Sequence, residues 1–379
     1  MCFCSQLYTG CEIRGGDVDD FFQHENQSVP PSLSDCGNLR FSAKSDLLTC
    51  LEKLCAKQKH ILLDGLAVVL DGAAIVQMLK PSCVKTFGEY AADVFIPYIA
   101  AQLRTACRVD LVWDRYYCNS LKATARASRG LAIRRLVGFG VPIPQNWQAF
   151  LRLDLNKTEL FRFLSKAVSS MTVEAGKQLV VTLDHDVVSV PELNNVSALS
   201  PCSHEEADTR MILHAADAAA RGIKRICIKT VDTDVVVLAV AYKQHIACKE
   251  LWVAFRTGKH FRYIPTHEIA ASMGQNECTA LPVFHAISGC DSTSSFAGKG
   301  KKTAWENWKG FPAVTAAFLE LSACPSRVSD ECFAAIERFV VLLYNRKSSS
   351  NEVNITRKQL FAQKGRTLEN IPPTKDALL

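Results

Sequence analysis

The chain has 379 residues, of which 48% are hydrophobic and 22% are charged, and its formal net charge is +6. This is ordinary globular composition, sufficient for one large domain with appendages or for two domains. No apolar run approaches the roughly 20 residues that cross a bilayer, which excludes a membrane-spanning protein. The mildly basic charge permits a polyanionic partner without requiring one.

Sixteen cysteines are present, but none falls in a CxxC pair. Zinc-ribbon and thioredoxin motifs are therefore excluded. The opening stretch is polar and acidic, so we expect no signal peptide. We expect reduced, mostly buried thiols in an intracellular protein, nuclear or cytoplasmic.

The first third of the chain predicts a strand–helix alternation. Residues 1–44 are rich in glycine, proline and polar residues and predict weak order. The elements expected after them are a helix over 45–58, a strand over 66–70, a helix over 73–79, a helix over 87–104 and a strand over 109–113. The two strands are followed by Asp71 and Asp114. This rhythm is typical of an α/β unit with a parallel sheet.

The segment between residues 115 and 153 carries no acidic residue and seven basic ones. Lys122, Arg126 and Arg129 fall on one stripe of a helix. The ordinary explanation is a solvated helix face. A segment whose charges are all positive, Arg134 and Arg135 included, indicates contact with phosphate.

The second half continues the alternation. The elements expected in order are a strand over 179–183, a turn-rich linker over 184–201, a helix from 203 to 221, a strand over 224–230, a strand over 250–255 with an edge partner over 261–264, and a helix over 266–273. An apolar stretch over 280–287 leads to Asp291, and core helices are expected within 312–345. The chain then turns polar and basic, and we expect a loosely held tail.

Seven carboxylates stand where an apolar run ends or a helix begins. They are Asp71, Asp114, Glu206, Asp208, Asp232, Asp234 and Asp291. Acids at strand ends along one edge of a sheet converge, and such a cluster stays ionised at neutral pH only if cations neutralise it. Oxygen ligands in this number suit Mg²⁺ or Mn²⁺, and two such ions activate water for attack on a phosphodiester.

These acids also have simpler explanations. Asp71 fits a helix N-cap, Ser203 and Glu206 match a capping box, and Asp232 and Asp234 fit a pair of turn aspartates. Glycosyltransferases carry a similar acid pair. The run that begins at Asp232 also matches the strand-Asp-x-Asp-x-Thr/Val pattern of haloacid-dehalogenase-type phosphatases, in which Asp232 would be the nucleophile.

A glycine-spaced loop with three lysines enters the helix that follows Asp291. It consists of Gly298, Lys299, Gly300, Lys301 and Lys302. Its backbone N–H groups and its charge suit a phosphate, and the simpler explanation is a lysine-rich connection between helices. No GxxxxGK[ST] motif precedes it, which excludes a P-loop.

Taken in order, these elements resemble the flap endonuclease family of the PIN-like 5′-nuclease superfamily over about residues 62–310. The resemblance rests on the strand before Asp71, the strand before Asp114 with its basic helix, the helix start Glu206-Ala207-Asp208-Thr209, the pair Asp232 and Asp234 after a strand, and Gly289-Cys290-Asp291 before the glycine–lysine loop. It implies an α/β fold of PIN-like type, with a central, mainly parallel twisted sheet flanked by helices. It also implies a helix-two-turn-helix at about 280–310.

The resemblance implies roles for individual residues. Two ions of Mg²⁺ or Mn²⁺ would be held by Glu206, Asp208, Asp232, Asp234 and Asp291. Asp71 and Asp114 would assist catalysis through bound water, with Lys122 and Arg126 drawing the scissile phosphate inward. Nucleic acid would also contact Arg129, Arg134, Arg135 and residues 298–302, where the family often binds K⁺. Asp208 stands where the family carries a glutamate, and about 60 extra residues precede the first strand.

We therefore predict a metal-dependent, structure-selective nuclease that acts as a monomer on DNA in preference to RNA. The alternatives are a catalytically inactive nucleic-acid-binding module of nuclease fold and a phosphatase that uses Asp232. The predicted organisation is an N-terminal extension over 1–60, a nuclease domain over 61–345 and a basic tail over 346–379.

Overall fold

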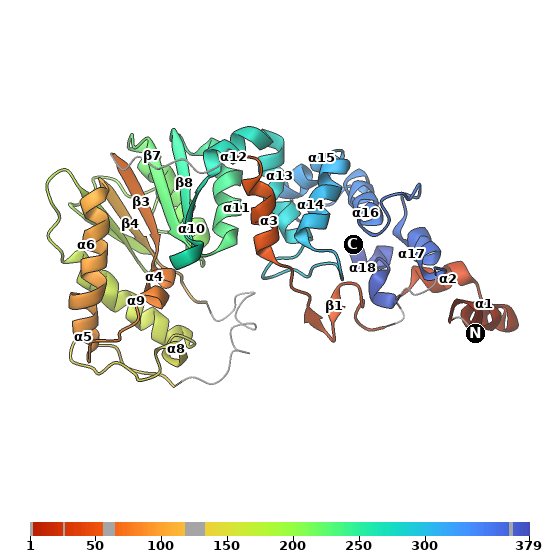
Figure 1. Ribbon diagram of the computed structural model, residues 1–379, viewed down its shortest axis with the longest axis horizontal. Coiled ribbons are helices and arrows are strands. Elements are labelled where there is room, and N and C mark those ends of the chain that lie inside the picture. Colours follow the sequence, from red (N-terminus) through yellow and green to blue (C-terminus); the bar gives the residue numbers. More distant parts are fainter. Residues whose placement is uncertain (1–2, 26, 56–64, 118–132, 364–366) are drawn as a thin grey trace. The chain divides into compact units, whose positions relative to one another are not determined.

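The computed structural model describes the chain apart from residues 1–2, 26, 56–64, 118–132 and 364–366 (Figure 1). It divides into two compact units, which we call the sheet unit (55–272) and the helical unit (1–54 with 273–379). The sequence-based boundaries were drawn differently, with the two ends of the chain kept separate. None of the helices in the described ranges is long and apolar enough to cross a membrane.

A mixed, mostly parallel sheet is the centre of the sheet unit. Its described strands follow the order β6-β5-β4-β3-β7-β8-β9. Their bounds are β3 (Leu66–Asp71), β4 (Arg108–Val112), β5 (Gln178–Leu183), β6 (Asp186–Val190), β7 (Arg225–Thr230), β8 (Glu250–Phe255) and β9 (Arg262–Pro265). β6 and β9 are antiparallel edge strands. The predicted α/β class and the edge hairpin are confirmed, whereas β6 replaces part of the predicted linker.

Helices cover both faces of this sheet. They are α4 (Gly72–Met78), α5 (Phe87–Glu89), the π-helix η1 (Tyr90–Phe95), α6 (Ile96–Thr105), α8 (Trp147–Phe150), α9 (Asp154–Ser169), α10 (Ala207–Ala220), α11 (Thr233–Tyr242), α12 (Thr266–Met273) and the 3₁₀ turns η2 (Lys243–His245) and η3 (Gly258–His260). α6 and α9 pack on one face and α10 and α11 on the other (Figure 1). The helix predicted over 87–104 is present, with a π-helical middle.

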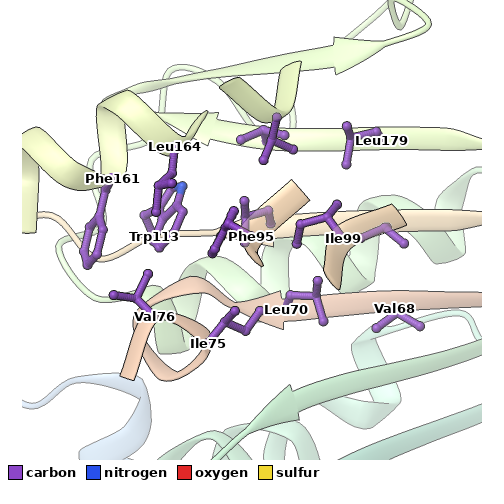
Figure 2. Packing of buried hydrophobic residues seen from close by; sticks show 14 of the residues in the cluster. Val68, Leu70, Ile75, Val76, Phe95, Ile99, Trp113, Phe161, Leu164 and Leu179 are labelled. Carbon is purple, nitrogen blue, oxygen red and sulfur yellow. The ribbon is translucent and has the colours of Figure 1, made fainter. Parts of the chain in front are cut away.

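The main core lies between the sheet and the face that carries α6 and α9. Leu66, Val68 and Leu70 of β3 belong to it. Because side chains alternate along a strand, Asp71 then falls on the opposite face, which α10 covers. Trp113, which follows β4, stacks between the rings of Phe95 and Phe161, with centroids 5.8 Å and 4.3 Å away (Figure 2).

A buried ion network attaches α10 to β4. Arg108 donates two hydrogen bonds of 2.7 Å to the carboxylate of Asp110 and lies 2.7 Å from Asp217 of α10. His214 Nδ1 of α10 lies 2.7 Å from Asp110. These contacts fix the axial position of α10, and therefore the place where its N-terminus meets the sheet.

The helical unit contains both ends of the chain. Its elements are α1 (Phe3–Arg14), α2 (Val18–Gln23), β1 (Ser34–Asp35), β2 (Asn38–Leu39), α3 (Lys44–Glu52), α13 (Gln275–Ile287), α14 (Lys301–Gly310), α15 (Val314–Ala323), α16 (Asp330–Tyr344), α17 (Val353–Phe361), the 3₁₀ turn η4 (Leu368–Asn370) and α18 (Lys375–Leu378). The core helices expected within 312–345 are α15 and α16.

The two segments expected to be weakly held are packed against each other. Phe22 of α2 contacts the ring of Phe361 of α17, with centroids 5.1 Å apart. Glu25 accepts hydrogen bonds from the guanidinium of Arg357 at 3.3 Å and from the backbone N–H of Thr374 at 2.9 Å. The described parts of the two segments, for which weak order was expected, thus contact each other through apolar rings and hydrogen bonds.

Candidate functional site

The carboxyl edge of the parallel strands brings acidic residues together. β3 ends at Asp71, β7 ends two residues before Asp232, and Asp114 lies two residues beyond β4. The strand order reverses between β3 and β7, since β4 lies on one side of β3 and β7 on the other. Ligands of open α/β sheets bind outside the carboxyl ends of the strands at such a switch point.

Three aspartates form the centre of this edge. One carboxylate oxygen from each of Asp208, Asp232 and Asp234 lies within 4.8 Å of the others, and all three side chains are partly buried. Asp208 is in the first turn of α10 and Asp234 in the first turn of α11. Asp232 is the N-cap of α11 and accepts a hydrogen bond from the backbone N–H of Asp234 at 2.9 Å. The simpler explanation, an aspartate that caps a helix, therefore holds for Asp232, which is at the same time a member of the cluster.

Asp71 lies beside these three residues and is buried. Its carboxylate accepts hydrogen bonds from the Thr230 hydroxyl and the backbone N–H of Ala74, both at 3.0 Å. It is thus the N-cap of α4 as well as a member of the cluster. Burial and, next, the charge of Asp114 raise the pKa of Asp71 to about 7.

Asp208 is the most strongly perturbed carboxyl of the group. Burial and the charge of Asp232, followed by those of Asp71 and Asp114, raise its pKa to about 9. Burial first, and then the neighbouring carboxylates, keep Asp208 protonated at neutral pH in the absence of a cation. Compensating positive charge is what such a site requires.

Asp114 connects β4 to the N-terminus of α10. Its carboxylate accepts a hydrogen bond from the backbone N–H of Ala207 at 2.8 Å and one from the Tyr116 hydroxyl at 3.3 Å. This carboxylate thereby satisfies one of the N–H groups that a helix start leaves without a partner. The same contact holds Asp208, one residue further on, against the carboxyl edge.

Two of the seven predicted acids are placed differently. Glu206 is the N-cap of α10 with extended backbone, so Ser203 does not cap the helix and the capping box does not form. Glu206 is not part of the three-carboxylate group found in the described chain. Asp291 belongs to the helical unit, where its carboxylate lies 2.7 Å from the ammonium of Lys44.

The predicted basic residues are only partly described. Lys122, Arg126 and Arg129 lie outside the described residues. Arg134 is exposed and pairs with Glu159 at 2.8 Å. Arg135 is exposed, and its backbone N–H donates to the side chain of Asn156 at 2.9 Å.

In the glycine–lysine loop, one lysine is a structural residue. Lys301 is fully buried, and its ammonium donates to the carbonyl of His285 at 2.8 Å and to the Ser288 hydroxyl at 3.0 Å. Lys301 was predicted to contact phosphate, but in the structure its ammonium is held by the carbonyl end of α13. Lys302 is exposed, Lys299 lies over the ring of Tyr344 at 4.9 Å, Gly298 has φ +67°, and Gly300 is the N-cap of α14.

The structure also contains functional candidates that the sequence analysis missed. A cavity of about 130 Å³ lies beside Asp114 and is lined by Arg115, Arg162 and Arg210 among other residues. Arg210 is buried within α10, two residues after Asp208. The sequence signal for it was an arginine on the face of α10 whose other residues are mostly apolar and buried.

Comparison with known proteins gives no family for this chain. No protein-family model matches it, and no curated protein matches it in sequence.

Proposed function

We propose that the chain is a metal-dependent nuclease of PIN-like fold that hydrolyses phosphodiester bonds in DNA or RNA. The observation that carries the proposal is the approach of Asp208, Asp232 and Asp234 to within 4.8 Å, with Asp71 and Asp114 beside them at the carboxyl edge. A dinucleotide site at this switch point would repel its own ligand, because a diphosphate is itself an anion. Five acids suit a phosphate only if divalent cations lie between them.

The donor set fits Mg²⁺ or Mn²⁺. All of the candidate ligand atoms are carboxylate oxygens, the hard ligands that these ions prefer. Asp208, Asp232 and Asp234 would hold the ions directly, and Asp71 and Asp114 would act through bound water. When bound, two ions would supply a nucleophilic water and stabilise the leaving oxygen of the phosphodiester.

The chain's own residues position this chemistry. Thr230 and the backbone N–H of Ala74 orient Asp71. The N-terminus of α10 orients Asp114, and the backbone N–H of Asp234 orients Asp232. Asp71, Asp114 and Asp232 are therefore each held in place by a hydrogen bond from the protein. This favours a preorganised site over a set of solvated turn aspartates.

The test is a cleavage assay on labelled 5′-flap, hairpin and single-stranded DNA and RNA, with Mg²⁺, Mn²⁺ or EDTA. Asp232→Asn is the informative variant, because asparagine retains the N-cap of α11 and removes the charge. Asp93→Asn, at an exposed position of η1, is the matched control. We expect cleavage that requires the metal, persists in the control and falls at least about 100-fold in Asp232→Asn.

Two other outcomes would change the assignment. Binding of nucleic acid without cleavage in either metal would leave a non-catalytic binding module. Hydrolysis of a small phosphomonoester with a covalent phosphate on Asp232 would identify a phosphatase, an assignment that gives Asp71, Asp114 and Asp208 no part in catalysis.

A further inference from the structure

The cavity beside Asp114 contains a buried arginine whose donors are incompletely used. Arg210 is 1% exposed, and its Nη1 donates to the backbone carbonyl of Asp184 at 3.0 Å. Its Nε and Nη2 are buried and form no hydrogen bond within the described chain. A charged group buried with unpaired donors costs several kcal/mol relative to one that is fully paired. An additional acceptor in the cavity that Arg210 lines would therefore be favourable.

The carboxylates around the cavity do not supply that acceptor, and the Cys202 side chain, which contacts Arg210, is only a weak acceptor. Arg162 is bound through two hydrogen bonds of 2.9 Å and 2.8 Å to the carboxylate of Asp184, so this acid is already paired. Asp114 is engaged by Ala207 and Tyr116. Asp184 thus pairs with Arg162, and Asp114 binds the start of α10. No carboxylate among these contacts pairs with Arg115 or Arg210, which also line the cavity.

Arg115 is placed to cooperate with Arg210. Its guanidinium donates to the carbonyl of Cys202 at 3.0 Å, lies 2.7 Å from the ring nitrogen of His185 and sits 4.7 Å from the centroid of Tyr117. None of these partners carries a formal negative charge at neutral pH. Burial lowers the pKa of Arg210, the Cys202 side chain opposes this shift, and the charge of Arg115 adds to it. An anion between the two guanidinium groups would relieve both effects.

We propose that this cavity binds a phosphate monoester, the terminal phosphate of the nucleic-acid strand to be cleaved. A volume of about 130 Å³ accommodates a phosphate group. Arginine forks are the preferred protein ligands for such dianions. Asp114 lines the cavity and contacts the start of α10, which carries Asp208, so a phosphate bound here places the strand end beside the acidic centre. Phosphate binding is inferred from the cavity alone. That the phosphate belongs to a nucleic-acid strand rests on the proposed function.

The first measurement is binding of inorganic phosphate to the full chain in EDTA, which is independent of catalysis. We expect saturable binding that weakens at least about tenfold in Arg210→Lys and in Arg115→Gln, since each loses charge-assisted hydrogen bonds. Arg115 is partly exposed, so its variant tests the site even if Arg210→Lys fails to fold. Arg104→Gln, exposed at the end of α6, is the control and should bind normally.

The second measurement compares cleavage of strands that end in a 5′-phosphate, a 3′-phosphate or hydroxyls. One phosphorylated end should be preferred at least about fivefold, and the preference should vanish in Arg115→Gln but persist in the Arg104→Gln control. No phosphate binding by the wild type, or equal binding by the variants, would overturn the site. Phosphate binding with no preference for either phosphorylated end would overturn the strand-end assignment. Phosphate binding without any cleavage would leave the site standing and count against the nuclease.

Discussion

The pKa of Asp208 is raised by burial and by the other carboxylates of the centre. Its pKa of about 9 lies above the value of about 3.9 expected in the unfolded chain. Between these two values the folded protein retains a proton that the unfolded chain releases. The contribution of Asp208 therefore favours folding below about pH 4 and is lost progressively as pH rises toward about 9.

We accordingly expect Asp208→Asn to raise the melting temperature of the metal-free protein at pH 8, by about 2–4 °C for each kcal/mol gained. The gain should shrink as the pH is lowered toward 5. Mg²⁺ or Mn²⁺ should stabilise the wild type more than the variant, because the cations favour the ionised carboxylates. Thermal unfolding across pH, with Asp93→Asn as control, measures this. A gain in the control of equal size would show a general charge effect.

Gly72 occupies a position that has no room for a side chain. A Cβ at this position would lie 2.2 Å from the ring of Trp113, which itself donates to the Ser165 hydroxyl at 2.8 Å. The glycine lets α4 begin directly after Asp71 while the tryptophan stays in the core.

We expect Gly72→Ala to destabilise the protein by about 1–3 kcal/mol, because the ring has to leave its stack against Phe161. Urea unfolding followed by tryptophan fluorescence measures both the free energy of unfolding and the displacement of the ring. Gly140→Ala, where an added Cβ meets nothing within 4 Å, should be close to neutral.

At the scale of elements, α10 is attached to β4 by charges rather than by apolar packing alone. Burial opposes ionisation of Asp110, but the charge of Arg108 and the hydrogen bond from His214 outweigh it, and the pKa of Asp110 is lowered. A carboxyl with a lowered pKa contributes stability above its unfolded value and loses it as pH falls.

We expect Asp110→Asn to cost about 3–5 kcal/mol at pH 7, because it leaves Arg108 buried with one charge partner fewer. Chemical unfolding measures the loss, which should diminish as the pH is lowered below about 4. Glu159→Gln removes the partly buried partner of the exposed Arg134 and should cost less than about 1 kcal/mol. Equal costs for the two variants would contradict the distinction between the buried and the exposed pair.

At the scale of the whole molecule, the two ends of the chain form part of one unit. α17 contacts α2 and α16, and Leu360 of α17 is 1% exposed. α17 is therefore packed into the core of the helical unit.

Two positions of α17 test this. Leu360→Ala should lower the free energy of unfolding of the helical unit by about 2–5 kcal/mol. Ile355→Ala, at a position 44% exposed on the same helix, should have little effect. Hydrogen exchange of α2 and α17 is the measurement. Similar exchange in both variants would show that the tail is not packed.

The sequence by itself determined the elements whose signals are local. The apolar runs at 66–70, 109–113 and 224–230 became β3, β4 and β7, because a buried parallel strand is read from a short apolar run. Since parallel strands end at one edge, the approach of Asp71, Asp114 and Asp232 also followed from their sequence positions.

Only the tertiary structure decided features that depend on distant partners. β6 needs β5 as its neighbour, and α1, α2 and α17 are stabilised by packing that no local pattern encodes. Likewise Lys301 is buried because the end of α13 accepts its charge, and Asp291 pairs with Lys44 from a segment 247 residues earlier. The cavity at Arg210 is lined by the segment that follows β4, by the end of β5, by α9 and by α10, so it exists only once these four parts have assembled.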